Sequence, residues 1–74
     1  MQIAGIARPS DSEILLAPTR ESGLAVARER EGNLVAVETV NDPKIHLKAR
    51  RLLAQGAVSI THVEELAPGR YQSP

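Results

Sequence analysis

The chain contains no Phe, no Trp and no Cys, and its one aromatic residue is Tyr71. Aromatic rings supply much of the buried area in small cores and in binding hot spots. A core must therefore come from the ten Ala residues and the nineteen Leu, Ile and Val residues. The absence of cysteine also excludes a disulfide, a thiolate nucleophile and a cysteine-ligated metal in this chain.

A length of 74 residues corresponds to one domain. We expect a single small domain over residues 1–69, followed by a C-terminal tail over 70–74. A domain of this size buries only about 60% of the surface that its unfolded chain exposes. Small folds are commonly supported by disulfides, metals or self-association. With no cysteine and two histidines, the chain is predicted to bind another protein or itself, with a homodimer as the simplest case.

The overall charge is balanced, with nine Lys and Arg residues against nine Asp and Glu residues. Nucleic-acid-binding proteins usually carry a basic excess, so this balance argues against nucleic acid as the main partner. No apolar run approaches the roughly 18 residues of a membrane helix. The N-terminus also lacks the basic and apolar regions of a secretory signal. These observations predict no membrane contact and a cytoplasmic location.

The N-terminal quarter is predicted to contain short strands. Gln2–Ala7 is apolar and is interpreted as a strand, and residues 8–12 form a loop. Glu13–Ala17 is interpreted as a second strand. A short helix is the alternative there, because Ser10 and Glu13 match a capping box. Residues 18–23 are predicted to form a loop.

The segments 24–30 and 34–40 are predicted to form a β-hairpin around a turn at Glu31-Gly32. The simplest register pairs Arg28 with Val35 and Val26 with Val37. It places the side chains of one face toward the core, namely Leu24, Val26, Val35 and Val37. A helix ending at Gly32 is the alternative, since Ala, Arg and Glu favour helix.

The clearest helix is predicted over residues 43–55. Asn41 or Asp42 can cap its N-terminus, Pro43 suits the first helical position and Gly56 can end it. Apolar residues recur at helical spacing and predict one buried side, consisting of Ile45, Ala49, Leu52 and Leu53.

After this helix, residues 57–61 are predicted to form a strand, and residues 62–67 fit either a helical turn or further strand. Pro68-Gly69 is interpreted as a turn. The fold class is therefore α+β: a small, mostly antiparallel sheet of three to five short strands with one amphipathic helix packed on one face, in the order β-β-β-β-α-β.

Four positive charges and no negative charge lie between residues 44 and 51. At about 100° per residue, they surround an exposed leucine on the side of the helix opposite the buried stripe. A solvated charged face is the simplest interpretation. The functional alternative is a partner-binding surface that attracts an acidic protein. Its residues are Lys44, Leu47, Lys48, Arg50 and Arg51.

The sequence shows no catalytic or metal-binding motif. No Ser lies in a Gly-x-Ser-x-Gly elbow, and no glycine-rich phosphate loop is present. His62 and Glu64 resemble part of a zinc deaminase element but lack its cysteine pair. We therefore predict no catalytic residue, no metal and no cofactor, and a small non-enzymatic regulatory module that acts through protein contacts. One alternative is nucleic-acid binding through the basic helix. Another is a small enzyme whose site forms between subunits, around His46 or His62.

Overall fold

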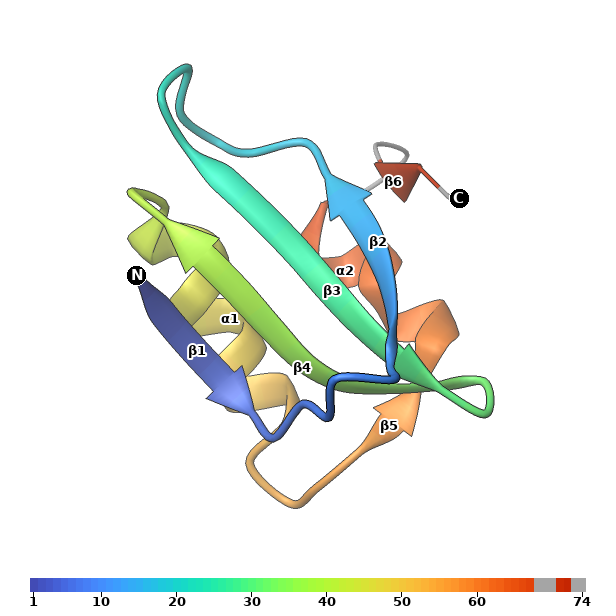
Figure 1. Ribbon diagram of the computed structural model, residues 1–74. Coiled ribbons are helices and arrows are strands. Elements are labelled where there is room, and N and C mark those ends of the chain that lie inside the picture. Colours follow the sequence, from blue (N-terminus) through green and yellow to red (C-terminus); the bar gives the residue numbers. More distant parts are fainter. Residues whose placement is uncertain (68–70, 73–74) are drawn as a thin grey trace.

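The computed structural model describes residues 1–67 and 71–72. Its elements follow one another as shown in Figure 1. They are β1 (Gln2–Gly5), β2 (Ser12–Leu16), β3 (Leu24–Arg30), β4 (Asn33–Val40), α1 (Pro43–Leu52), β5 (Val58–Ser59), the 3₁₀ turn η1 (Ile60–His62), α2 (Val63–Leu66) and β6 (Tyr71–Gln72).

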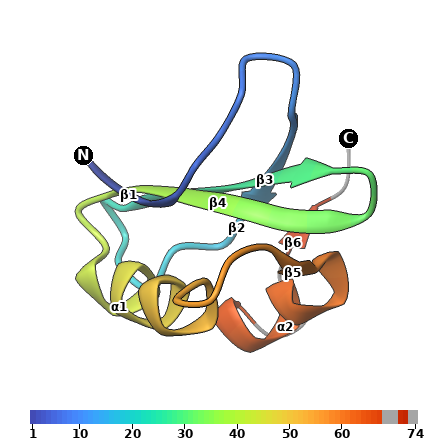
Figure 2. The same ribbon diagram turned by 90° about the horizontal axis from the view of Figure 1, so that it is seen from below.

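The strands form one antiparallel sheet with the order β1-β4-β3-β2-β6, and β5 pairs with the start of β4. Both helices lie on one side of the sheet, and the β1–β2 connection rises on the other side (Figure 2). The predicted α+β class and the antiparallel sheet are confirmed. In the described part of the chain, no helix is long and apolar enough to cross a membrane.

The hairpin of β3 and β4 is confirmed, but its predicted register is wrong beyond the first pairs. Glu31 and Gly32 both have positive φ, as a type I′ hairpin turn requires. Glu29 then pairs with Leu34 whereas Arg28 pairs with Ala36, so Val35 is the extra residue of a β-bulge.

The bulge changes which residues of β3 face the helices. A shift of one residue in register moves a strand's side chains to opposite faces. The predicted core residues Leu24 and Val26 therefore lie on the face without helices, where Leu24 is 48% exposed. Ala25 and Ala27 take their place in the core and are fully buried.

The core is built from small and aliphatic side chains. Three alanines in the central strands and in α1, Ala25, Ala27 and Ala49, are fully buried together with Leu34 and Ile45. Because an alanine side chain occupies little space, it lets a helix approach the sheet closely. Among residues 1–67, the core is therefore closed by aliphatic side chains alone.

The helix α1 begins where the capping residues predict. The Asp42 carboxylate accepts a hydrogen bond from the Ile45 N–H at 3.2 Å, and Pro43 follows it. Residues 45 and 49 of the predicted stripe are fully buried. The helix ends at Leu52, three residues before the predicted end at 55, and Gly56 adopts a φ of +111° in the connection that follows.

The strand predicted over 57–61 is shorter than expected. β5 covers only Val58–Ser59, and the Ser59 side chain accepts a hydrogen bond from the Thr61 N–H that starts η1. The helical alternative for residues 62–67 is confirmed by α2. The predicted turn at 68–69 lies outside the described residues, and β6, within the segment 70–74, pairs with β2.

Candidate interaction surfaces

The basic helix surface, made of Lys44, Leu47, Lys48, Arg50 and Arg51, lies on the solvent side of α1. All five residues are exposed, and Leu47 is 47% exposed. Among the described residues, its four cations make no ion pair and no side-chain hydrogen bond. The structure therefore leaves all five predicted partner-binding residues in solvent, with Arg50 toward β1 and Lys48 and Arg51 toward α2, and their role stays a prediction.

A second surface was not predicted: the face of the sheet opposite the helices, here called the open sheet face. Cross-strand partners place Ile3, Val26 and Leu15 in one row across β1, β4, β3 and β2, with Glu38 between Ile3 and Val26. Its apolar members are Ile3, Leu15, Leu24, Val26 and Val40, four of which are 39% to 53% exposed. Contiguous exposed apolar residues are typical of interaction sites, which makes this face a candidate.

The open sheet face also carries a paired charge at its centre. Arg28 Nη1 lies 3.4 Å from Glu38 Oε1, and the arginine side chain is only 11% exposed. The same guanidinium donates to the carbonyl oxygens of Arg8 and Asp11 at 2.8 and 3.2 Å. The predicted register contains no bulge and would place residues 28 and 38 on opposite faces of the sheet. The sequence analysis therefore did not predict this ion pair.

The β1–β2 connection is fixed above the sheet by Asp11. Its carboxylate accepts two hydrogen bonds of 2.7 Å from the Arg30 guanidinium and one of 2.7 Å from the Arg8 N–H. The hydrogen bond from Arg30 lowers the pKa of Asp11 from 3.8 to about 2. Burial opposes this shift, whereas the Arg8 N–H and the charges of Arg30 and Arg28 support it. Asp11 therefore stays ionised and holds the loop.

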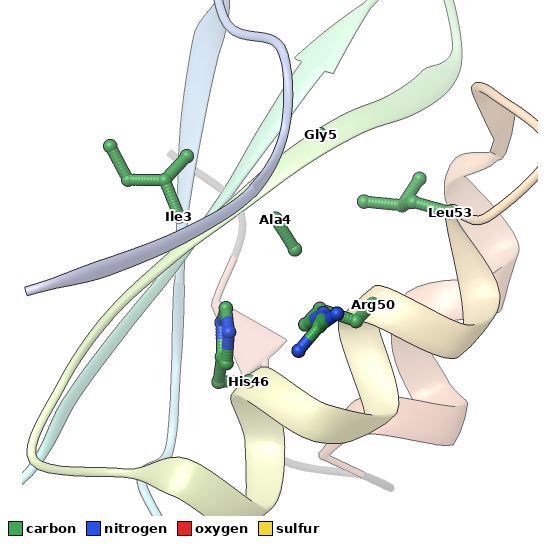
Figure 3. Close-up of a pocket in the computed structure, with 6 residues that line it drawn as sticks. All are labelled: Ile3, Ala4, Gly5, His46, Arg50 and Leu53. Atoms are coloured by element: carbon green, nitrogen blue, oxygen red, sulfur yellow. The ribbon is translucent and has the colours of Figure 1, made fainter.

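The two histidines lie apart and do not form a catalytic or metal site. His62 Nδ1 pairs with a carboxylate oxygen of Glu65 at the surface. His46 lies on α1 and lines a hollow beside β1 with Arg50, and no carboxylate lines that hollow (Figure 3). Among the described residues, no group of three His, Cys, Asp or Glu side chains could hold a metal ion.

A pattern in the sequence could have indicated the open sheet face. In β2, Leu15 has an apolar residue on both sides along the strand, and in β1 Ile3 is followed by Ala4, so apolar side chains lie on both faces of these strands and either face could be the core. Only the pairing of Ala4 with Val37 and of Ile14 with Ala27 decides which face the helices cover.

The comparisons with known proteins identify the family. A family model described as "Reductase C-terminal" matches residues 1–67, so the chain belongs to this family. No curated protein and no solved structure matches the chain.

This membership corrects the sequence-based function. The chain was predicted to be a separate, non-enzymatic regulatory module and not an enzyme. Both predictions are wrong, because the family is the C-terminal part of a reductase. The chain lacks every local motif of redox chemistry, so composition and spacing could not reveal the assignment. Of the two alternatives, nucleic-acid binding and a small enzyme, the enzyme agrees better with membership of a reductase family.

Proposed function

We propose that this member of the Reductase C-terminal family is the C-terminal domain of an oxidoreductase of the ferredoxin or rubredoxin reductase type. We further propose that the open sheet face docks on the part of the enzyme that carries the redox group. The observation that carries the proposal is the group of exposed apolar side chains on this face, with one on each of β1, β2, β3 and β4, on a domain whose family belongs to a larger enzyme.

The residues of this chain do not fit the redox group of such an enzyme. A redox-active disulfide needs two cysteines, and the chain has none. A dinucleotide is bound by a glycine-rich turn at a helix N-terminus. Here the N-terminus of α1 is closed by the buried Asp42 carboxylate, which accepts from Ile45 and from Thr19. We therefore assign binding of the pyridine nucleotide and the redox chemistry to the rest of the enzyme.

The open sheet face suits a lasting contact between domains. Its apolar residues would leave water on docking, and burial of apolar area is the main source of stability in such contacts. Arg28 and Glu38 are paired with each other, so neither of these two would be buried as an isolated charge on docking. The helices already cover the other face of the sheet (Figure 2).

The basic helix surface suits a transient contact with an acidic protein. Its four cations are unpaired among the described residues and surround the exposed Leu47. Complementary charge raises the rate of association, and a central apolar residue adds affinity. We propose that this surface attracts the acidic electron carrier of the reductase.

A chimera would test both assignments. The C-terminal domain of a reductase of this type is replaced by the present chain, and reduction of ferredoxin or rubredoxin is measured beside reduction of the small acceptor ferricyanide. Leu15→Glu on the open sheet face is expected to release the domain, which limited proteolysis and a lower melting temperature of the enzyme would show. Leu47→Glu, a matched control on α1, should leave the domain docked.

Leu47→Glu and Arg51→Glu are expected to raise KM for the protein carrier by about tenfold, with ferricyanide reduction unchanged. A Leu15→Glu chimera with unaltered protease resistance and melting would refute docking through the open sheet face. A chimera that reduces ferricyanide but no protein carrier would refute the proposed role of this chain in the reductase.

A further inference from the structure

The strand β1 forms one edge of the sheet. It pairs with β4 over Gln2–Gly5, and no strand of the described residues pairs with its other side. The Ile6 N–H donates a hydrogen bond to the Val35 carbonyl oxygen at 3.1 Å. This bond shows which residues of β1 direct their backbone groups toward β4. Because hydrogen-bonded pairs alternate in an antiparallel ladder, the amides and carbonyls of Ile3 and Gly5 point away from β4.

A hollow runs along this free edge, between β1 and α1 (Figure 3). Ala4 and Leu53 give it an apolar lining. His46 and Arg50 extend toward it from successive turns of α1, four residues apart. A strand placed beside β1 would therefore have two nitrogen-bearing side chains beneath it.

The polar groups of this hollow lack partners. Arg50 makes no ion pair or side-chain hydrogen bond among the described residues. His46 Nδ1 is buried and has no hydrogen-bond partner within the described part of the chain. A buried nitrogen without a partner is unfavourable, and an acceptor in the hollow would relieve this cost once the imidazole ring turns to present that nitrogen. A carboxylate would suit both side chains, because it accepts hydrogen bonds from the arginine guanidinium and from an imidazole N–H.

We propose that β1 binds an extended protein segment as an additional strand, and that the segment alternates apolar residues with carboxylates. Successive side chains of a strand point to opposite faces. The apolar ones would lie beside Ile3, which is 53% exposed on the open sheet face, and the carboxylates beside His46 and Arg50. Backbone pairing would give affinity, and the alternation would give specificity.

A second copy of β1 does not match this edge. Residues 1–8 contain no Asp or Glu, so a paired β1 would bring no carboxylate to the hollow. A two-fold arrangement would also bring two copies of Arg50 toward the same edge, where like charges repel. The charge of the hollow therefore favours an acidic segment over self-association.

The experiment uses the 74-residue chain and a fluorescent, end-blocked peptide of alternating Val and Glu, with a Val and Lys peptide as the control. Fluorescence anisotropy measures binding. The acidic peptide is expected to bind, and Arg50→Glu to weaken it by about tenfold, as loss of a charge-assisted contact implies. Arg20→Glu, the matched control, lies in the β2–β3 loop outside the hollow and outside the basic helix surface and should change the affinity by less than about twofold.

A second variant tests the backbone pairing. Ile3→Pro removes an N–H that faces away from β4, which an edge strand tolerates. It should abolish binding while thermal unfolding stays close to that of the original chain. Hydrogen exchange of the Ile3 and Gly5 amides should slow when the peptide binds.

Three results would overturn the proposal: equal binding of both peptides or of neither, unchanged affinity in Arg50→Glu, and slowed exchange confined to residues away from β1. The outcome is independent of the reductase role, because no cofactor or electron carrier takes part in the measurement.

Discussion

Asp42 joins the β2–β3 loop to the start of α1, and its replacement should be the most damaging polar substitution there. The residue is 1% exposed. Its carboxylate accepts from the Thr19 N–H at 2.5 Å, from the Thr19 hydroxyl at 2.6 Å and from the Ile45 N–H at 3.2 Å. It therefore caps α1 and also ties the β2–β3 loop to that helix.

The expected size of the effect follows from these contacts. Loss of a helix N-cap costs about 1 kcal/mol. A hydrogen bond to a charged acceptor contributes about 1.5–3 kcal/mol, and unpaired buried donors add to the loss. Removal of the buried charge offsets part of this cost. Asp42→Ala should therefore destabilise the domain by about 3 kcal/mol, a large part of the stability of so small a fold.

Urea unfolding followed by circular dichroism would measure this loss. Asp42→Asn keeps one acceptor and should cost about 1 kcal/mol, and Thr19→Val, which removes only the hydroxyl contact, should cost a similar amount. The m-value should stay unchanged, since the area exposed on unfolding is the same. A loss below about 1 kcal/mol in Asp42→Ala would show that water replaces these contacts and that the reasoning is wrong.

Acid should destabilise the domain through Asp11, because a lowered folded-state pKa gives stability that is present above about pH 4 and is lost as the pH falls toward 2. Urea midpoints between pH 5 and pH 2 should fall less steeply in Asp11→Asn; an identical slope would contradict this assignment. Some acid sensitivity should remain in that variant, since hydrogen bonds from Thr19 and Ile45 and the charge of Arg20 lower the pKa of Asp42 despite its burial. Gly5→Ala should cost well over 1 kcal/mol, because φ is +82° and the new Cβ would collide with the Val35 carbonyl oxygen. Gly32→Ala, at φ +83° but in open space, should cost about 1 kcal/mol, and equal thermal shifts in both variants would show that the collision is relieved.

The two proposed surfaces of this domain differ in physical character. The open sheet face is apolar with its central charges paired, whereas the basic helix surface carries unpaired cations among the described residues. The first suits a permanent contact inside an enzyme and the second suits a brief encounter with an acidic protein. Leu15→Glu and Leu47→Glu separate the two, because they place the same charge on opposite sides of the molecule.

Much of the local structure could be predicted from the sequence because it depends on neighbouring residues. Glu31-Gly32 supplies the positive φ of the hairpin turn, and Asp42-Pro43 starts the helix. The apolar spacing of α1 selects the helix side that is buried, and so leaves the basic residues in solvent. Charge balance and residue counts also follow from composition, but they could not show that the chain belongs to the Reductase C-terminal family.

Only the tertiary structure decided which face of the sheet is the core. A bulge at Val35 shifts the pairing by one residue, and this buries Ala25 and Ala27 instead of Leu24 and Val26. Hydrophobicity alone would favour burial of Leu24 and Val26, because their side chains are larger and more apolar than those of the alanines. The alanines are buried because helices that pack close to the central strands need small side chains beneath them. That requirement arises from contacts distant in sequence, which a strand's own alternating pattern does not contain.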